Sequence, residues 1–235
     1  MDHDLSFIQY QHHTKLIEEI IDEFSNKAEV IGILLIGSVA RGDAYENSDL
    51  DLCILIEGEM KKKFICEERL DTVVEFKYAT LNQIKLNLER NHMELYSFLD
   101  GKIMLDRQGT LENLIDIAQE KYASYRASRK KKDSISHWLT SSFIKINNAI
   151  NTKDLKKAMF IVNTTTWTIY EGLWAVNDKP IPPVGAICFY FKELDQLPNN
   201  INSLTNQMLL GDVNERIDST KELIKWIQSN IYSRY

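Results

Sequence analysis

The chain has 235 residues, of which 44% are hydrophobic and 26% charged, and its formal net charge is −6. This length suffices for one large domain or two smaller ones, each with its own core. The composition is ordinary for a globular protein. The acidic balance argues against a nucleic-acid partner, because a phosphate backbone attracts basic surfaces.

The three cysteines, Cys53, Cys66 and Cys188, show no metal-ligand spacing, so we expect free thiols in a reducing compartment. The polar, acidic N-terminal stretch does not resemble a signal peptide. No apolar run approaches the roughly 20 residues that span a bilayer. These features predict a cytoplasmic protein without a membrane partner.

Helical and strand patterns alternate over the first 109 residues. Apolar residues at helical spacing predict a helix over 12–27, and the run VIGILLIG predicts a strand over 30–37 that is buried on both faces. The other predicted elements follow in chain order: a short helix or turn after residue 37, a strand over 50–57, a helix over 60–70, a strand over 71–79, a helix over 80–90 with a threonine cap, and a strand over 102–107.

No convincing strand pattern follows residue 109. A long helix is predicted over 110–132, and Thr110 opens it with a capping-box pattern. Further helices are predicted near 134–150, 154–177, 186–197 and 212–233, with a proline-rich loop over 178–185. The four tryptophans fall in these helices, where we expect them in the core. The patterns predict an α+β fold: a small mixed sheet with flanking helices over 1–109, then an all-α bundle over 110–235.

The stretch GSVARGDAYENSDLDL, residues 37–52, places acids on a predicted buried strand. Asp49 and Asp51 point to the same face because they lie two residues apart. Such like charges repel unless a cation lies between them, and oxygen ligands suit Mg²⁺. Glu75 interrupts the apolar positions of the next strand and joins the aspartates if that strand pairs beside theirs. Three carboxylates around Mg²⁺ equip a protein for in-line phosphoryl or nucleotidyl displacement.

A phosphate site is predicted directly before these acids. Gly37 and Ser38 end a strand and open a helix, so free backbone N–H groups and the serine hydroxyl can bind nucleotide phosphates. Arg41 either reaches a phosphate or locks the loop to an acid. The stretch therefore predicts a phosphate cradle followed by a metal clamp.

These residues resemble the signature of the DNA polymerase β-like nucleotidyltransferase superfamily: Gly-Ser, then Ala-Arg-Gly, then Ser-Asp-x-Asp. The matching positions are Gly37, Ser38, Ala40, Arg41, Gly42, Ser48, Asp49 and Asp51, and Glu75 resembles the third carboxylate. The layout with a helical domain after the catalytic one resembles the aminoglycoside and lincosamide nucleotidyltransferases of bacteria.

The resemblance implies a catalytic domain over 1–109 and a helical substrate or partner domain over 110–235. It implies that Gly37, Ser38, Arg41 and Ser48 bind ATP or another NTP, and that Asp49, Asp51 and Glu75 bind Mg²⁺ and act in catalysis. An acceptor hydroxyl attacks the α-phosphorus and pyrophosphate leaves. A glutamate serves as general base in drug-modifying relatives, with Glu171 and Glu94 as candidates here. Some relatives have active sites between subunits, which leaves a homodimer open.

Three functions stay open at this point. The first is transfer of a nucleoside monophosphate to a small molecule such as an aminoglycoside-type antibiotic. The second is modification of a protein hydroxyl, as in antitoxins that adenylylate a helical toxin. The third is a regulatory module that binds nucleotide without turnover, against which the complete set of three acids argues.

Overall fold

The computed structural model describes residues 4–59 and 63–233. The chain divides into two compact units. The first contains Met1–Ser124 and Pro182–Phe189, and the second contains Tyr125–Ile181 and Tyr190–Tyr235. The chain thus leaves the first unit after Ser124, beyond the predicted position at 109, and returns to it for one short segment.

A five-stranded sheet forms the centre of the first unit. Its strands are β1 (Val30–Ile36), β2 (Leu50–Ile56), β3 (Phe64–Arg69), β4 (Thr72–Ala79) and β5 (Lys102–Asp106). Their order in the sheet is β3-β4-β2-β1-β5. β2 and β4 are parallel, whereas the other neighbouring pairs are antiparallel. A mixed sheet with flanking helices confirms the predicted α+β class.

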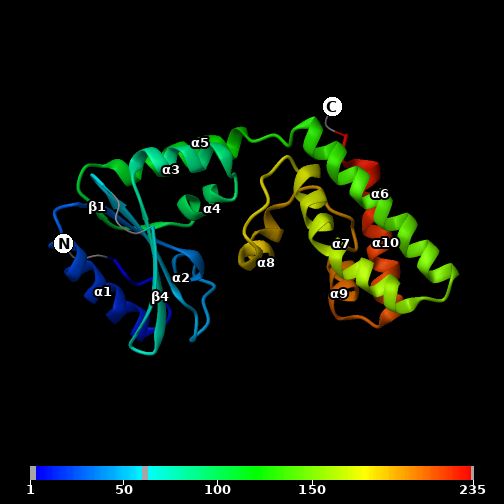
Figure 1. Cartoon of the computed structure of the whole chain (residues 1–235), viewed down its shortest axis with the longest axis horizontal. Helices are drawn as coiled ribbons and strands as arrows, with labels where there is room; N and C mark the ends of the chain where they lie inside the picture. Colours follow the sequence, from blue (N-terminus) through cyan, green and yellow to red (C-terminus); the bar gives the residue numbers. More distant parts are fainter. Residues whose placement is uncertain (1–3, 60–62, 234–235) are drawn as a thin grey trace. The chain divides into compact units, whose positions relative to one another are not determined.

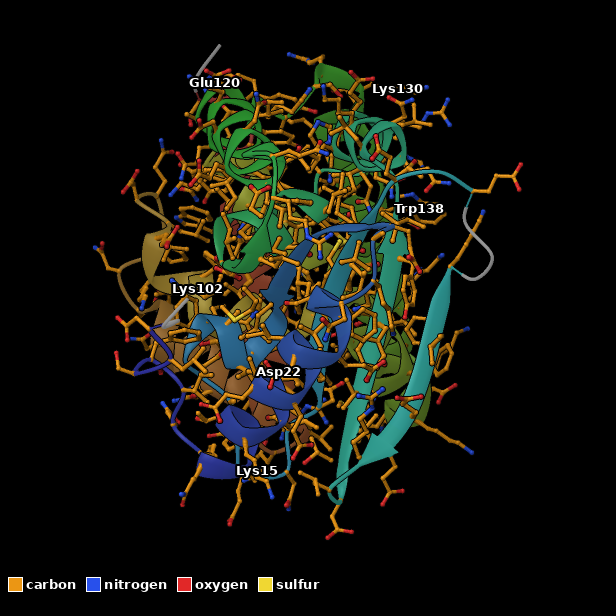
Figure 2. The ribbon with its side chains drawn as sticks, turned by 90° about the vertical axis from the view of Figure 1, so that its left-hand side faces the viewer. Lys15, Asp22, Lys102, Glu120, Lys130 and Trp138 are labelled. Carbon is orange, nitrogen blue, oxygen red and sulfur yellow. The ribbon has the colours of Figure 1, made fainter. Side chains whose placement is uncertain are left out.

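Helices cover both faces of this sheet (Figure 1). The helices of the unit are α1 (Gln11–Ser25), α2 (Gly37–Arg41), α3 (Leu81–Arg90), α4 (Glu94–Leu99), α5 (Thr110–Ser124), the 3₁₀ turn η1 (Val184–Ala186) and the start of α8 (Ile187–Tyr190). One apolar cluster joins α1 to the sheet, and a second joins α3, α4 and α5 to the opposite face. β1 is buried at every position, as predicted. Figure 2 shows α1 in front of the strands, with Lys15 and Asp22 on its solvent side.

The helix predicted over 60–70 is wrong in its described part, because Phe64–Arg69 forms the edge strand β3. Its side chains alternate between exposed and half-buried. Leu70 and Asp71 have φ angles of 49° and 59° and close a two-residue hairpin to β4. Pairing with β4 therefore overrides the helical propensity of the charged residues. Residues 60–62 lie outside the described residues.

The continuous helix predicted over 110–132 is also wrong, because α5 ends at Ser124 and a new helix begins at Arg129. Ser128 caps this second helix by accepting a hydrogen bond from the Lys131 N–H. At the start of α5 the carboxylate of Asp106 accepts the N–H groups of residues 110–112. The threonine cap predicted for α3 is confirmed, as Thr80 forms a capping box with Gln83.

The second unit consists of helices and turns in its described residues, 125–181 and 190–233, as predicted. These are α6 (Arg129–Asn151), α7 (Leu155–Val176), the 3₁₀ turn η2 (Phe191–Glu193), α9 (Ile201–Leu210) and α10 (Val213–Asn230). α9 and, in the first unit, α4 were not predicted, and the helix predicted over 186–197 is broken into η1, α8 and η2. Across the described parts of the chain, no helix is long and apolar enough to cross a membrane.

Buried contacts of the second unit include an ion pair. Lys132 at the start of α6 and Asp178 after α7 lie 2.9 Å apart, with side chains only 1% and 8% exposed. The prediction of core tryptophans is confirmed for Trp174 and wrong for Trp138, which is 57% exposed. The spacing of Trp138 within a helix did not reveal which face of α6 meets its neighbours.

Candidate functional site

The turn from β1 into α2 places a glycine against an acid. Gly37 has a φ of 75°, which favours glycine, and a Cβ atom there would collide with the Asp51 carboxylate. The residue before α2 is Ile36, whose apolar side chain makes no capping hydrogen bond, so the first N–H groups of the helix can bind an anion. Because α2 has only five residues, these N–H groups rather than a long helix dipole make the turn suited to phosphate.

The three predicted acids come together on the sheet. Asp51 of β2 lies directly beside Glu75 of β4 in the parallel register, as the metal-clamp prediction required. Carboxylate oxygens of Asp49, Asp51 and Glu75 all lie within 4.8 Å of one another. Three anionic oxygen donors so close together fit a hard divalent cation such as Mg²⁺. We call these residues the acid triad.

Lys77 contacts two members of the acid triad. Its Nζ lies 2.7 Å from an oxygen of Asp51 and 3.4 Å from one of Glu75. Burial lowers the pKa of Lys77, but the hydrogen bonds and charges of the two acids outweigh burial and raise it overall. The ammonium group is therefore charged at neutral pH. Sequence reasoning missed this role, although Lys77 lies two residues after Glu75 and shares its face of β4.

A cavity of about 300 Å³ lies over the turn and two of the acids. Its lining includes Gly37, Ser38, Arg41, Asp49, Asp51 and Lys77. Pro183, Gly185 and Ala186 complete the lining from the segment that returns to the first unit. The predicted phosphate cradle and two of the acids thus surround one hollow, and we call it the nucleotide cavity.

Arg41 is held by acids in the structure. Its guanidinium lies 2.9 Å from Asp43 and 3.5 Å from Asp100, and its side chain is 9% exposed. It also stands over the ring of Phe189, with 5.6 Å from Cζ to the ring centroid. Of the two predicted tasks, these contacts match locking the loop to an acid, and a contact with phosphate stays a prediction.

Ser48 precedes the first acid and is fixed from two sides. Its hydroxyl accepts the N–H of Tyr45 at 2.9 Å, and its carbonyl lies 3.0 Å from Nε2 of the buried His13. Burial lowers the pKa of His13 more than the bond to Ser48 raises it. The neutral ring therefore donates from Nε2 to Ser48 and positions the chain next to Asp49. Sequence reasoning missed His13, because no other potential ligand stands at a characteristic spacing from it. Nucleotide binding by Ser48 stays a prediction.

A second, larger cavity of about 590 Å³ adjoins the first along the same face of the sheet. The two cavities share Ile36, Lys77, Ser97 and Pro183 in their linings. Glu94 is half-buried in the larger cavity and accepts a weak hydrogen bond from Asn91 at 3.4 Å. Cys53 also lines it, and burial raises the pKa of this thiol to about 12, so it stays protonated. We call this hollow the side cavity.

The predicted general base Glu171 lies on α7 in the second unit. It is half-buried, with an oxygen 3.8 Å from Nζ of Lys131. Together with Trp138 these residues line a cavity of about 310 Å³ within that unit. Glu171 is therefore accessible to a ligand of the helical unit, and its role as a base stays a prediction.

Comparison with known proteins agrees with this geometry. A family model described as "Polymerase beta, Nucleotidyltransferase" matches residues 18–110, which include α2, the acid triad and Lys77. A protein of Methanocaldococcus jannaschii named "Putative protein adenylyltransferase" is 32% identical over 118 residues, which cover 43% of this chain and 80% of that protein. The chain belongs to the polymerase β-like nucleotidyltransferase superfamily. This nucleotidyltransferase is therefore an enzyme of the transferase class.

Among solved structures, a nucleotidyltransferase-like protein from Exiguobacterium sibiricum aligns with a TM-score of 0.48 and 14% identity. The alignment covers 92% of this chain and 74% of that chain.

Proposed function

We propose that this nucleotidyltransferase uses Mg²⁺ to transfer a nucleoside monophosphate from ATP to a hydroxyl group of a small molecule, such as an aminoglycoside-type antibiotic, and releases pyrophosphate. The observation that carries the proposal is the acid triad, gathered within 4.8 Å beside the Gly37 turn. Under this proposal, the metal ligands and the backbone groups that bind phosphate are neighbours.

The residues of the nucleotide cavity divide the work. The N–H groups at Gly37 and Ser38 hold the outer phosphates, and their partial positive charge offsets the charge of the leaving pyrophosphate. Asp49, Asp51 and Glu75 would hold Mg²⁺, which when bound neutralises phosphate charge and lowers the pKa of an attacking hydroxyl. Arg41, pinned by acids, keeps α2 and its turn in place for these contacts.

The side cavity supports a small-molecule acceptor. Cys53 and Lys77, which line it, form the next pair on the same face of β2 and β4 after Asp51 and Glu75. The side cavity therefore lies directly beside the acid triad. Gln83, Asn87 and Asn91 recur every four residues on and directly after α3 and line one wall, where carboxamides can both donate to and accept from hydroxyl groups. A volume of about 590 Å³ suits a drug-sized molecule.

Two glutamates compete for the role of general base. Glu171 is proposed from the resemblance to drug-modifying enzymes. Glu94 is supported by its place in the side cavity, close to the proposed acceptor. Glu94→Gln and Glu171→Gln distinguish the two candidates. The variant that lacks the true base should lose turnover and still bind nucleotide.

A protein hydroxyl is the second candidate acceptor. The named relative from M. jannaschii favours it, and the match to that relative covers less than half of this chain. The rest of the chain is free to serve a different acceptor from that of the relative. Transfer to protein predicts a mass increase of one nucleotide on a co-expressed protein.

The deciding experiment measures pyrophosphate release from each of the four NTPs with Mg²⁺ and a panel of aminoglycosides and lincosamides. A variant with Asp49→Asn and Asp51→Asn serves as the blank. Release that requires one acceptor and is lost in the blank supports the small-molecule proposal. Silence with all acceptors, together with a nucleotide-sized mass increase on protein, supports the second candidate. Turnover that persists in the blank contradicts the role of the acid triad.

A further inference from the structure

Lys77 places a positive charge where the acid triad would bind its metal. The ammonium group contacts Asp51 at 2.7 Å and Glu75 at 3.4 Å, so it already neutralises part of the charge that attracts a cation. Over residues 4–59 and 63–233, the ion pairs join no other cation to the triad. Lys77 is therefore the local counter-ion of the described acids.

The side chain of Lys77 has room to leave this position. It is 46% exposed, so packing does not hold the ammonium group in place. Lys77 lines both the nucleotide cavity and the side cavity, so either offers a new position within one side-chain length. A displaced ammonium group in the nucleotide cavity lies near the predicted phosphate site, where a nucleotide would supply a new negative partner.

We propose that Lys77 is an internal competitor of the metal and sets the affinity of the acid triad for a divalent cation. A cation that binds without nucleotide must displace the ammonium group from two carboxylates and then bind beside a repelling charge. A cation that arrives with a nucleotide meets less resistance, because the phosphates accept Lys77. The enzyme thus favours the metal–nucleotide complex over the free metal. This inference deepens the proposed function and rests on the acid triad being its metal site.

Titration of the nucleotide-free protein with Mn²⁺ tests this competition, with free Mn²⁺ measured by electron paramagnetic resonance. Even at the dielectric constant of water, a divalent and a monovalent charge about 7 Å apart repel strongly enough to predict roughly tenfold tighter binding by Lys77→Met, so tenfold is the smallest gain expected. Lys85→Met is the matched control, because it removes the same charge from the exposed side of α3. Lys85→Met should bind Mn²⁺ within about twofold of the unaltered protein by the same reasoning. Lys77→Arg keeps the charge and should retain weak binding.

Two results would overturn the proposal: Lys77→Met binding Mn²⁺ no tighter than the unaltered protein, or Lys85→Met gaining as much. Adding Asp51→Asn to Lys77→Met should remove the gain, because the gained affinity depends on the triad. Thermal unfolding without metal verifies folding, and Lys77→Gln replaces Lys77→Met if the latter unfolds. The titration contains neither NTP nor acceptor, so a wrong acceptor leaves its result unaffected. A failure of every variant to bind Mn²⁺ overturns both the metal site and this inference.

Discussion

Exchange of Gly37 for alanine tests how closely the phosphate turn and the acid triad are fitted together. The φ of 75° at Gly37 disfavours alanine, which costs about 1–2 kcal/mol of stability. The new Cβ would also collide with the carboxylate of Asp51, and it would approach Cβ of that residue to 3.2 Å. The carboxylate must therefore shift, and its other oxygen, which accepts a hydrogen bond from Lys77 at 2.7 Å, moves with it.

The expected effect on turnover is much larger than the effect on stability. Displacement of a catalytic group by about 1 Å costs roughly 100-fold in rate, so Gly37→Ala should lose at least that much pyrophosphate release. The accompanying 1–2 kcal/mol corresponds to a few degrees in the midpoint of thermal unfolding for a chain of this size. Turnover and thermal unfolding are measured on the same preparation.

Gly42→Ala is the matched control within the same motif. Gly42 has a φ of 85°, so alanine there meets the same backbone cost, but among the described residues nothing beyond its chain neighbours lies within 4 Å of the new Cβ. Both variants should therefore lose similar stability, and only Gly37→Ala should lose turnover. Turnover within twofold of the unaltered enzyme for Gly37→Ala would refute the reasoning, as would an equal loss for Gly42→Ala.

Three further predictions follow from single residues. Asp49→Asn should lower pyrophosphate release more than about 100-fold while the thermal unfolding midpoint stays unchanged, because the side chain is exposed and serves as a ligand. Lys132→Met should cost about 3–5 kcal/mol in urea unfolding because Asp178 stays buried without its counter-ion, and Asp178→Asn in the same chain should restore part of the loss. Burial lowers the pKa of His13 in the folded state below its ordinary value of 6.5. As the pH falls below 6.5, the unfolded state binds a proton at this residue before the folded state does, so the protein loses stability. His13→Gln should flatten this decline in unfolding midpoints between about pH 7 and 5, whereas the exposed His137→Gln should not.

Sequence reasoning succeeded where local chemistry decides the structure. The turn at Gly37, the buried strand before it and the shared face of Asp49 and Asp51 follow from residue types and spacing within residues 30–52. The meeting of Asp51 with Glu75 needed one assumption, the pairing of β2 beside β4, which the sheet confirms. Because side chains alternate between the two faces of a sheet, this pairing is enough to put Asp51 and Glu75 on the same face.

The failures lie where distant contacts decide the structure. The charged residues of β3 favour a helix by themselves and form a strand because β4 offers a partner. The exposure of Trp138 depends on which face of α6 is covered by its neighbours. The hydrogen bond between His13 and Ser48 joins residues 35 positions apart, which no local pattern reveals. The contact of Lys77 with the triad lay within reach, since Glu75 and Lys77 share a face of one strand.

The return of Pro182–Phe189 to the first unit limits which fragments and chimeras of this protein can keep a complete nucleotide cavity. The chain passes from one unit to the other three times, so no single cut separates them. A fragment that ends at Ser124 would lack Pro183, Gly185 and Ala186 and would leave the nucleotide cavity open along one wall. Exchanging the helical half for that of another enzyme would replace those three residues as well. Single substitutions within this chain are therefore a better route to a new acceptor specificity than replacement of its whole helical half.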